Sequence, residues 1–161
     1  LQGDAPMTPA HFVRALIEEF SKNKSSDIIT PVTQLSWTEL DLLRDNKRQT
    51  PFSGTTAVID ENKRALWFSK NIIPAIRKEN RRDLLSPVYR HIGLYGYKRE
   101  ALERYVTLPM SHYEYLEGLE QLRALESGMT IQTVVVDYSG LPAMTGIDSP
   151  EDLARAEHLL S

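Results

Sequence analysis

Hydrophobic residues near the start of the chain recur with helical spacing. Thr8 and Pro9 are typical of a helix cap followed by a first turn. Phe12, Leu16 and Phe20 then fall on one face of a helix. The pattern predicts an amphipathic helix that begins at these residues and packs one side against a core.

A second helical pattern covers residues 111–128. Leucines recur every third position along it, at Leu116, Leu119, Leu122 and Leu125, and Gly128 follows as a stop signal. The spacing predicts one amphipathic helix over the whole range.

Three further helices are expected from local signals. Ser36 and Glu39 have the spacing of a capping box, which predicts a short helix from residue 36. Residues 99–108 have a helical composition. Ser149 and Pro150 supply the cap and first-turn proline of a last helix.

Strands are expected where β-branched and aromatic residues run together. Such runs occupy residues 27–35, 55–60, 65–69, 88–98 and 130–137. The polar turn between the second and third runs predicts a β-hairpin. Pro31 favours an edge strand or a bulge for the first run. Residues 70–87 are polar, basic and proline-bounded, and most of them are expected to form a loop.

The alternation of strands and helices predicts an α/β fold. The chain starts with what resembles the end of a strand, so we expect part of the sheet to be missing from this sequence. The 161 residues are 41% hydrophobic and 25% charged, a composition typical of one soluble globular domain.

Composition also excludes several functions. A net charge of −3 gives no support to nucleic-acid or anionic-membrane binding, and no apolar run is long enough to insert into a membrane. The absence of cysteine excludes disulfides, thiol catalysis and zinc–thiolate sites. These properties are compatible with a cytoplasmic protein.

Two aspartates are candidate metal ligands. Asp4 follows a strand-like end, and Asp148 precedes the cap of the last helix. In open α/β sheets ligands bind at the carboxyl ends of strands, and Mg²⁺ is usually held by one or two carboxylates together with phosphates and water. The alternative is that Asp4 is a turn residue and Asp148 a loop or capping acid, a common use of aspartate.

His91 lies within an aromatic strand pattern. A histidine there is more often a packed, hydrogen-bonded core residue, whereas the functional alternative is a donor to a sugar hydroxyl or a carboxylate. The remaining histidines have no partner spacing and are expected at the surface: His11, His112 and His158.

Polar residues along the 111–128 helix allow two interpretations. Glu117 and Gln121 share a face, as do Glu120 and Arg123. They form either a solvated surface or a site that hydrogen-bonds a polyhydroxylated ligand. The basic residues of the 70–87 loop are expected to be solvated, with a role over an anionic substrate as the alternative: Lys78, Arg81 and Arg82.

Five motifs occur in a fixed order: QGDAP, ALWFSK, YRHIGLYGYKRE, LEGLEQLRALESG and TGIDSPEDLARAE. The ordered set, over nearly the whole chain, resembles the 3-deoxy-manno-octulosonate (Kdo) cytidylyltransferase family. The resemblance implies a Rossmann-like three-layer nucleotidyltransferase domain with a mixed, mostly parallel sheet. It also implies that residues 36–87 carry a hairpin insertion that helps to form a homodimer.

The implied reaction joins CTP to an acidic eight-carbon sugar, giving CMP-sugar and pyrophosphate for lipopolysaccharide synthesis. By this likeness Asp4 and Asp148 hold Mg²⁺, and Lys70 faces the sugar carboxylate. Sugar contacts are implied for His91, Tyr95, Tyr97, Glu120, Gln121 and Ser69.

The sequence departs from the family pattern in several places. Ala5 replaces a glutamate after the aspartate, Lys70 replaces an arginine, and SHYE at 111–114 replaces SPLE. The family's N-terminal strand and its basic, CTP-phosphate-binding loop have no counterpart here, so the sequence corresponds to the C-terminal portion of such a domain. The departures favour a variant sugar, such as an amino-substituted octulosonate. A sialic-acid-like substrate and a catalytically incomplete, sugar-binding or dimerising fragment remain as alternatives.

Overall fold

The computed structural model describes residues 8–79, 81–140 and 157. Helices and strands are both present in this part of the chain, as the sequence predicts, but four strands and then three helices follow one another without alternating. In order, the elements are α1 (Ala10–Lys22), β1 (Ile28–Gln34), α2 (Trp37–Gln49), β2 (Thr56–Ile59), β3 (Ala65–Ser69), β4 (Tyr89–His91), β5 (Gly96–Tyr97), α3 (Arg99–Tyr105), α4 (His112–Glu117), α5 (Gln121–Glu126) and β6 (Ile131–Val135).

The described strands form one mixed sheet around β1. The order is β3-β2-β4-β1-β5, and β6 also pairs with β1. Only the β1–β6 pair runs parallel among the described strands; the other pairings are antiparallel. The mixed sheet was expected, but the expected majority of parallel pairs is not found in this part of the chain. Both β4 and β5 run antiparallel to β1, and β2 and β3 continue the antiparallel pairing beyond β4.

Pro31 lies within the central strand rather than at an edge. On one side β1 pairs with β6, and on the other it pairs with β5 through Ile28 and Ile29 and with β4 from Val32 onward. The carbonyl of Pro31 accepts a hydrogen bond from Ile92 N–H, at the interruption between β4 and β5. The N–H that proline lacks therefore falls where regular pairing is already broken, which allows a proline in a central strand.

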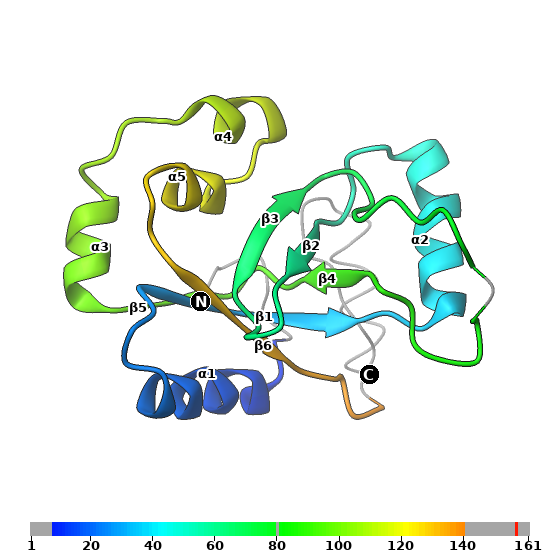
Figure 1. Cartoon of the computed structure of the whole chain (residues 1–161), viewed down its shortest axis with the longest axis horizontal. Helices are drawn as coiled ribbons and strands as arrows, with labels where there is room; N and C mark the ends of the chain where they lie inside the picture. Colours follow the sequence, from blue (N-terminus) through cyan, green and yellow to red (C-terminus); the bar gives the residue numbers. More distant parts are fainter. Residues whose placement is uncertain (1–7, 80, 141–156, 158–161) are drawn as a thin grey trace.

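Both faces of the sheet are covered, which gives the three layers expected. Alternate residues of β1 point to opposite faces. Ile28 packs into a core with Phe68 and Leu122, and Ile29 packs into a second core with Phe12 of α1. Figure 1 accordingly shows α1 below β1 and β6, and α3 to α5 on the other side.

The β2–β3 hairpin was predicted correctly, and it curls back onto the far strand of the sheet. Arg64 in its turn forms an isolated antiparallel bridge with Gln132 of β6. Thr133 donates two hydrogen bonds to the carbonyl of Lys63, from its N–H at 2.8 Å and from Oγ1 at 2.7 Å. The hairpin is therefore attached at both ends, through β4 and through β6.

Two elements predicted as continuous are interrupted. The run 88–98 forms only the short strands β4 and β5. The helix expected over 111–128 is two helices, because Gly118 adopts φ 63° and ends α4. The leucine spacing continues across this break because Leu119 and Leu122 are both buried in the same core.

Local capping signals were largely correct. The Ser36–Glu39 capping box is formed at the start of α2. The first helix begins one residue later than predicted, with Pro9 rather than Thr8 at the cap position. The helix predicted from Ser149 lies outside the described residues. Within them, no helix has both the length and the apolar character needed to cross a lipid bilayer.

Candidate functional site

The end of β3 is tied to the end of α4 by one carboxylate. Glu117 Oε1 accepts a hydrogen bond from Ser69 Oγ at 2.8 Å, and Oε2 accepts one from the backbone N–H of Lys70 at 2.8 Å. Ser69 is buried and Lys70 is half-buried. Glu117 thus belongs to the site rather than to a solvated helix face, and it orders the segment that carries Lys70.

A second lysine binds the carbonyl group in the same segment. Lys47, in the last turn of α2, donates from Nζ to the carbonyl of Lys70 at 2.6 Å. The same ammonium donates to the carbonyls of Ser53 at 2.5 Å and Gly54 at 3.1 Å. Burial and the nearby charges of Lys70 and Arg90 lower the pKa of Lys47, while Glu117 opposes this shift.

His91 follows Arg90 on β4, and its side chain makes a hydrogen bond to Thr30. Its Nε2 lies 2.8 Å from Thr30 Oγ1, and the single hydroxyl proton of Thr30 is directed to the carbonyl of Leu94 at 2.8 Å. Nε2 is then the protonated nitrogen, and Nδ1 is left as an acceptor. Burial, followed by the charge of Lys70, lowers the pKa of His91 to about 3, so the ring is neutral at pH 7.

Tyr95 and Gln121 extend the site from His91 towards α5. The His91 and Tyr95 rings lie 5.4 Å apart, and Tyr95 donates its hydroxyl proton to Gln121 Oε1 at 3.0 Å. Gln121 is buried, and its Nε2 has no hydrogen-bond partner among the described residues. A buried amide donor without a partner is costly, which makes this atom a candidate contact for a ligand oxygen.

The side chains of Tyr97 and Glu120 border the same region. Tyr97 stacks towards Tyr105 with ring centres 5.7 Å apart, and Tyr105 donates to the carbonyl of Glu120 at 3.1 Å. Burial raises the pKa of Tyr95 and of Tyr97, and the charge of Glu120 contributes to both shifts. The phenols are therefore hydrogen-bond donors rather than anions at neutral pH.

Three cations give the site a positive character. Within the described part of the chain, no carboxylate lies within salt-bridge distance of the side chains of Lys47, Lys70 or Arg90. Glu117 uses both oxygens on Ser69 and on the backbone of Lys70. The arrangement is suited to an anionic, hydroxyl-bearing ligand, held by the charge of Lys70 at one end and by neutral polar groups at the other.

The structure brings together most of the residues selected from sequence. Ser69, Lys70, His91, Tyr95 and Gln121 share one region, and Tyr97 and Glu120 lie beside it. Asp4 and Asp148 lie outside the described residues, so the metal site stays a prediction. In the described segments there is no group of three or more His, Asp or Glu side chains suited to a metal ion.

Three site residues were not found from the sequence. Thr30 gave no signal beyond a β-branched strand residue, and Arg90 precedes His91 without a spacing that sets it apart. Lys47 lies in the polar last turn of α2, where lysine is common. Only the folding of the 50–54 turn over this residue gives it a role.

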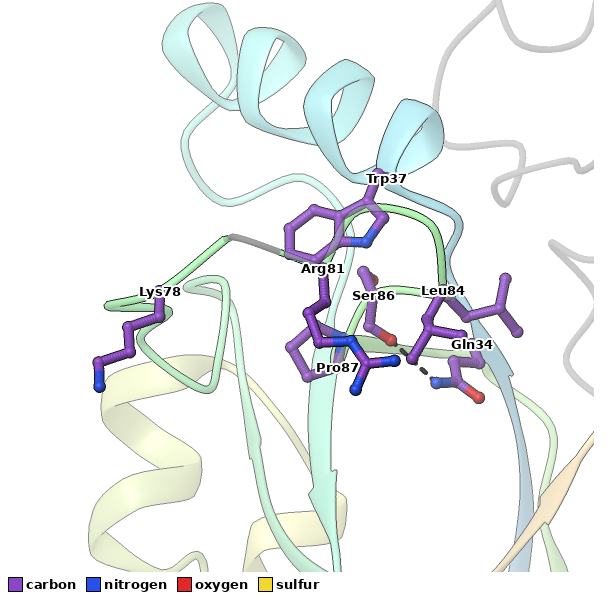
Figure 2. Close-up of a pocket in the computed structure, with 8 residues that line it drawn as sticks. Gln34, Trp37, Lys78, Arg81, Leu84, Ser86 and Pro87 are labelled. Atoms are coloured by element: carbon purple, nitrogen blue, oxygen red, sulfur yellow. Dashed lines mark hydrogen bonds between the residues drawn. The ribbon is translucent and has the colours of Figure 1, made fainter.

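A separate pocket opens at the start of α2 (Figure 2). It has a volume of about 520 Å³ and is lined by residues of β1, α2 and the 78–87 loop: Gln34, Trp37, Lys78, Arg81, Leu84, Leu85, Ser86 and Pro87. Gln34 Nε2 donates to the carbonyl of Ser86 at 2.9 Å across it. None of the Lys70 or His91 neighbours described above lines this pocket, so it is distinct from the candidate site.

Sequence comparisons identify relatives that extend beyond this chain. The Kdo cytidylyltransferase of Maricaulis maris (strain MCS10) is 40% identical over 161 residues, which are 100% of this chain and 61% of the relative. The enzyme of the same name from Elusimicrobium minutum (strain Pei191) is 39% identical over 97% of this chain and 59% of its own length. The chain therefore spans less than two thirds of these relatives.

A solved structure gives the same picture of the fold. The CMP:2-keto-3-deoxy-manno-octonic acid synthetase complexed with CTP superimposes with a TM-score of 0.79 at 30% identity, over 99% of this chain and 59% of that one. A family model described as Cytidylyltransferase matches residues 1–131. Since this match covers most of the 161 residues, the chain belongs to the cytidylyltransferase family.

Proposed function

We propose that this chain is the sugar-binding portion of an enzyme that activates Kdo, or a close variant, with CTP. The observation that carries the proposal is the position of Lys70. Its backbone is held by Glu117 and Lys47, and its charge is close enough to His91 to contribute to the lowered pKa of that residue. The names of the relatives and of the solved structure support the same substrate class.

The sugar is bound at two ends in this proposal. Lys70 faces the carboxylate and attracts it by its charge. Gln121 Nε2, which has no partner among the described residues, then donates to a sugar hydroxyl, while His91 Nδ1 and the hydroxyl oxygen of Tyr95 accept from hydroxyl groups. Ser69, Tyr97 and Glu120 supply further contacts in this proposal. Neutral donors and acceptors suit hydroxyls because they bind them without drawing in a counter-charge.

The reaction is a transfer of the cytidylyl group. The anomeric hydroxyl oxygen of the sugar forms a bond to the α-phosphorus of CTP, the bond from that phosphorus to the bridging oxygen breaks, and pyrophosphate leaves while the hydroxyl proton is lost to solvent or base. Catalysis of such transfers depends on positioning and on stabilising charge. The protein residues described above supply the position of the sugar.

Mg²⁺ is the cofactor in this proposal, held by Asp4 and Asp148. When bound, it neutralises charge on the phosphate oxygens and orients them. The carboxylate of Glu117 does not fit this role, because both of its oxygens already accept hydrogen bonds from the protein. Carboxylates from the two aspartates are the ligand type that Mg²⁺ takes together with phosphates.

The proposal also includes an oligomeric state and a cellular role. Residues 36–87 contribute to a homodimer, and the product is used in lipopolysaccharide synthesis in the cytoplasm, where nucleotide triphosphates are available. The hairpin within this segment also forms part of the main sheet through β4.

Calorimetric titration of the chain with Kdo tests the proposal. We expect binding to the unmodified chain and at least tenfold weaker binding to Lys70→Ala. Lys22→Ala, which removes an exposed lysine of α1, is the matched control and should bind normally. Equal affinity of all three proteins for Kdo would contradict the assignment of Lys70.

Pyrophosphate release separates an active enzyme from a sugar-binding fragment. The assay contains Mg²⁺, CTP and Kdo, and is run on this chain and on a longer chain of the length of its relatives. Sugar binding with turnover only in the longer chain indicates the fragment. Competition between Kdo and an amino-substituted octulosonate then tests the variant-sugar alternative, which equal preference would contradict.

A further inference from the structure

The backbone N–H and carbonyl of Lys70 are each held by a charged side chain, one from α4 and the other from α2. Its N–H donates to Glu117 Oε2 at 2.8 Å, and its carbonyl accepts from Lys47 Nζ at 2.6 Å. Glu117 is the last residue of α4, and Lys47 belongs to α2. Two helices that are distant in sequence therefore fix one residue at the end of β3.

Both side chains are themselves anchored. The second oxygen of Glu117 accepts from Ser69, and Lys47 donates further to the carbonyls of Ser53 and Gly54. Neither of these bonds involves the ammonium group of Lys70. The charges of Glu117 and Lys47 are opposite, so together they add no net charge and leave that of Lys70 to act on a ligand.

We propose that Lys47 and Glu117, named here the Lys70 clamp, are positioning residues for anion binding. This inference rests on the proposed function. A lysine side chain is long and flexible, so the position of its ammonium depends on how firmly its backbone is held. Small displacements of positioning groups can reduce catalysis strongly. The clamp fixes the Lys70 backbone, and Lys70 alone contacts the sugar carboxylate.

Hydrogen exchange measures the clamp without any ligand. Lys47→Met keeps a similar side-chain length without donors, and Glu117→Gln removes the charge and one acceptor. Both variants are expected to exchange the backbone N–H of Lys70 at least tenfold faster than the unmodified chain. Lys98→Met is the control, since Lys98 also donates to a backbone carbonyl, that of Lys24, away from the site.

Kdo titration measures the consequence. Lys47→Met is expected to lower the affinity for Kdo about tenfold. When Lys70→Ala is already present, adding Lys47→Met should cause no further loss, because the clamp acts only through Lys70. A general structural defect would instead add to the effect of Lys70→Ala and would lower the melting temperature well below that of Lys98→Met.

The outcomes are distinct. Faster exchange in both clamp variants together with a non-additive loss of affinity supports the proposal. Unchanged exchange at Lys70, unchanged affinity in Lys47→Met, or an additive loss in the double variant overturns it. If the unmodified chain binds no Kdo, the proposed function fails, and the exchange measurement still decides whether the clamp holds Lys70.

Discussion

The hydroxyl of Thr30 fixes the tautomer of His91. Thr30 Oγ1 directs its proton to the carbonyl of Leu94, so the His91 ring must donate from Nε2 across the 2.8 Å separation. The ring is held neutral, with a pKa lowered to about 3 by burial and by Lys70. His91 lies where β4 pairs with β1, so protonation of its ring affects the stability of the fold.

We expect stability to fall with acidity in a window set by His91. The unfolded chain binds a proton near the ordinary pKa of 6.5, whereas the folded chain does so only near 3. The free energy of unfolding is therefore unaffected by this histidine above pH 6.5. It falls progressively as the pH decreases from 6.5 towards 3, by at most about 1.4 kcal/mol per pH unit, because only the unfolded chain takes up the proton. Denaturant unfolding at several pH values measures this.

His91→Gln provides the comparison for this pH dependence. Its amide retains a donor for Thr30 but does not titrate. The difference in unfolding free energy between the two proteins should change between pH 6.5 and 4 and stay constant above pH 7.5. Parallel pH profiles would contradict the assigned pKa.

The ion pair between Glu114 and Arg123 is expected to hold α4 and α5 together. Arg123 donates to both carboxylate oxygens, at 2.8 Å and 2.5 Å, and the Glu114 side chain is only 8% exposed. Arg123→Met leaves this carboxylate buried without its cation and should destabilise the chain by about 2–4 kcal/mol. Arg99→Met is the control, because its pair with Glu103 is exposed and should matter by less than about 0.5 kcal/mol.

Gly96 is expected to tolerate no side chain beside Phe20. A Cβ at this position would lie 2.5 Å from Cε2 of the Phe20 ring. Gly96→Ala should therefore destabilise the chain by about 1–3 kcal/mol through overpacking. Thermal unfolding of the double variant with Phe20→Leu should show partial recovery, and strict additivity of the two changes would refute the close contact.

Lys70→Arg is expected to bind Kdo more tightly than the unmodified chain. A guanidinium forms two parallel hydrogen bonds with a carboxylate, whereas an ammonium acts as a point charge. We expect a gain of severalfold, measured by calorimetric titration, and a loss of at least tenfold for Lys70→Met. A weaker Arg variant would indicate that Lys70 faces something other than a planar carboxylate.

Features that depend on neighbouring residues were predictable from the sequence. The Ser36–Glu39 capping box and the β2–β3 hairpin are both set by contacts within a few positions, and both are present. The interruption at Gly118 was missed because buried leucines on either side preserve the helical spacing. Glycine alone does not reveal whether its backbone adopts a positive φ.

The site was predictable only in part for a related reason. His91, Tyr95 and Gln121 were identified through the family resemblance, and the structure brings them together. The role of Lys47 depends on carbonyls at Ser53, Gly54 and Lys70, which no side-chain pattern encodes. Backbone acceptors are the same in every residue, so a partner of this kind is visible only after folding.

The parallel pairing of β1 with β6 has a consequence for synthesis on the ribosome. Ile28 pairs with Ile131, and the neighbouring Asp27–Thr130 bond joins residues 103 positions apart. A nascent chain that has emerged only as far as Gly128 presents the β-branched edge of β1 without its partner, which exposes it to association with other chains. Release of β6 from the ribosome is therefore the step at which this side of β1 becomes protected.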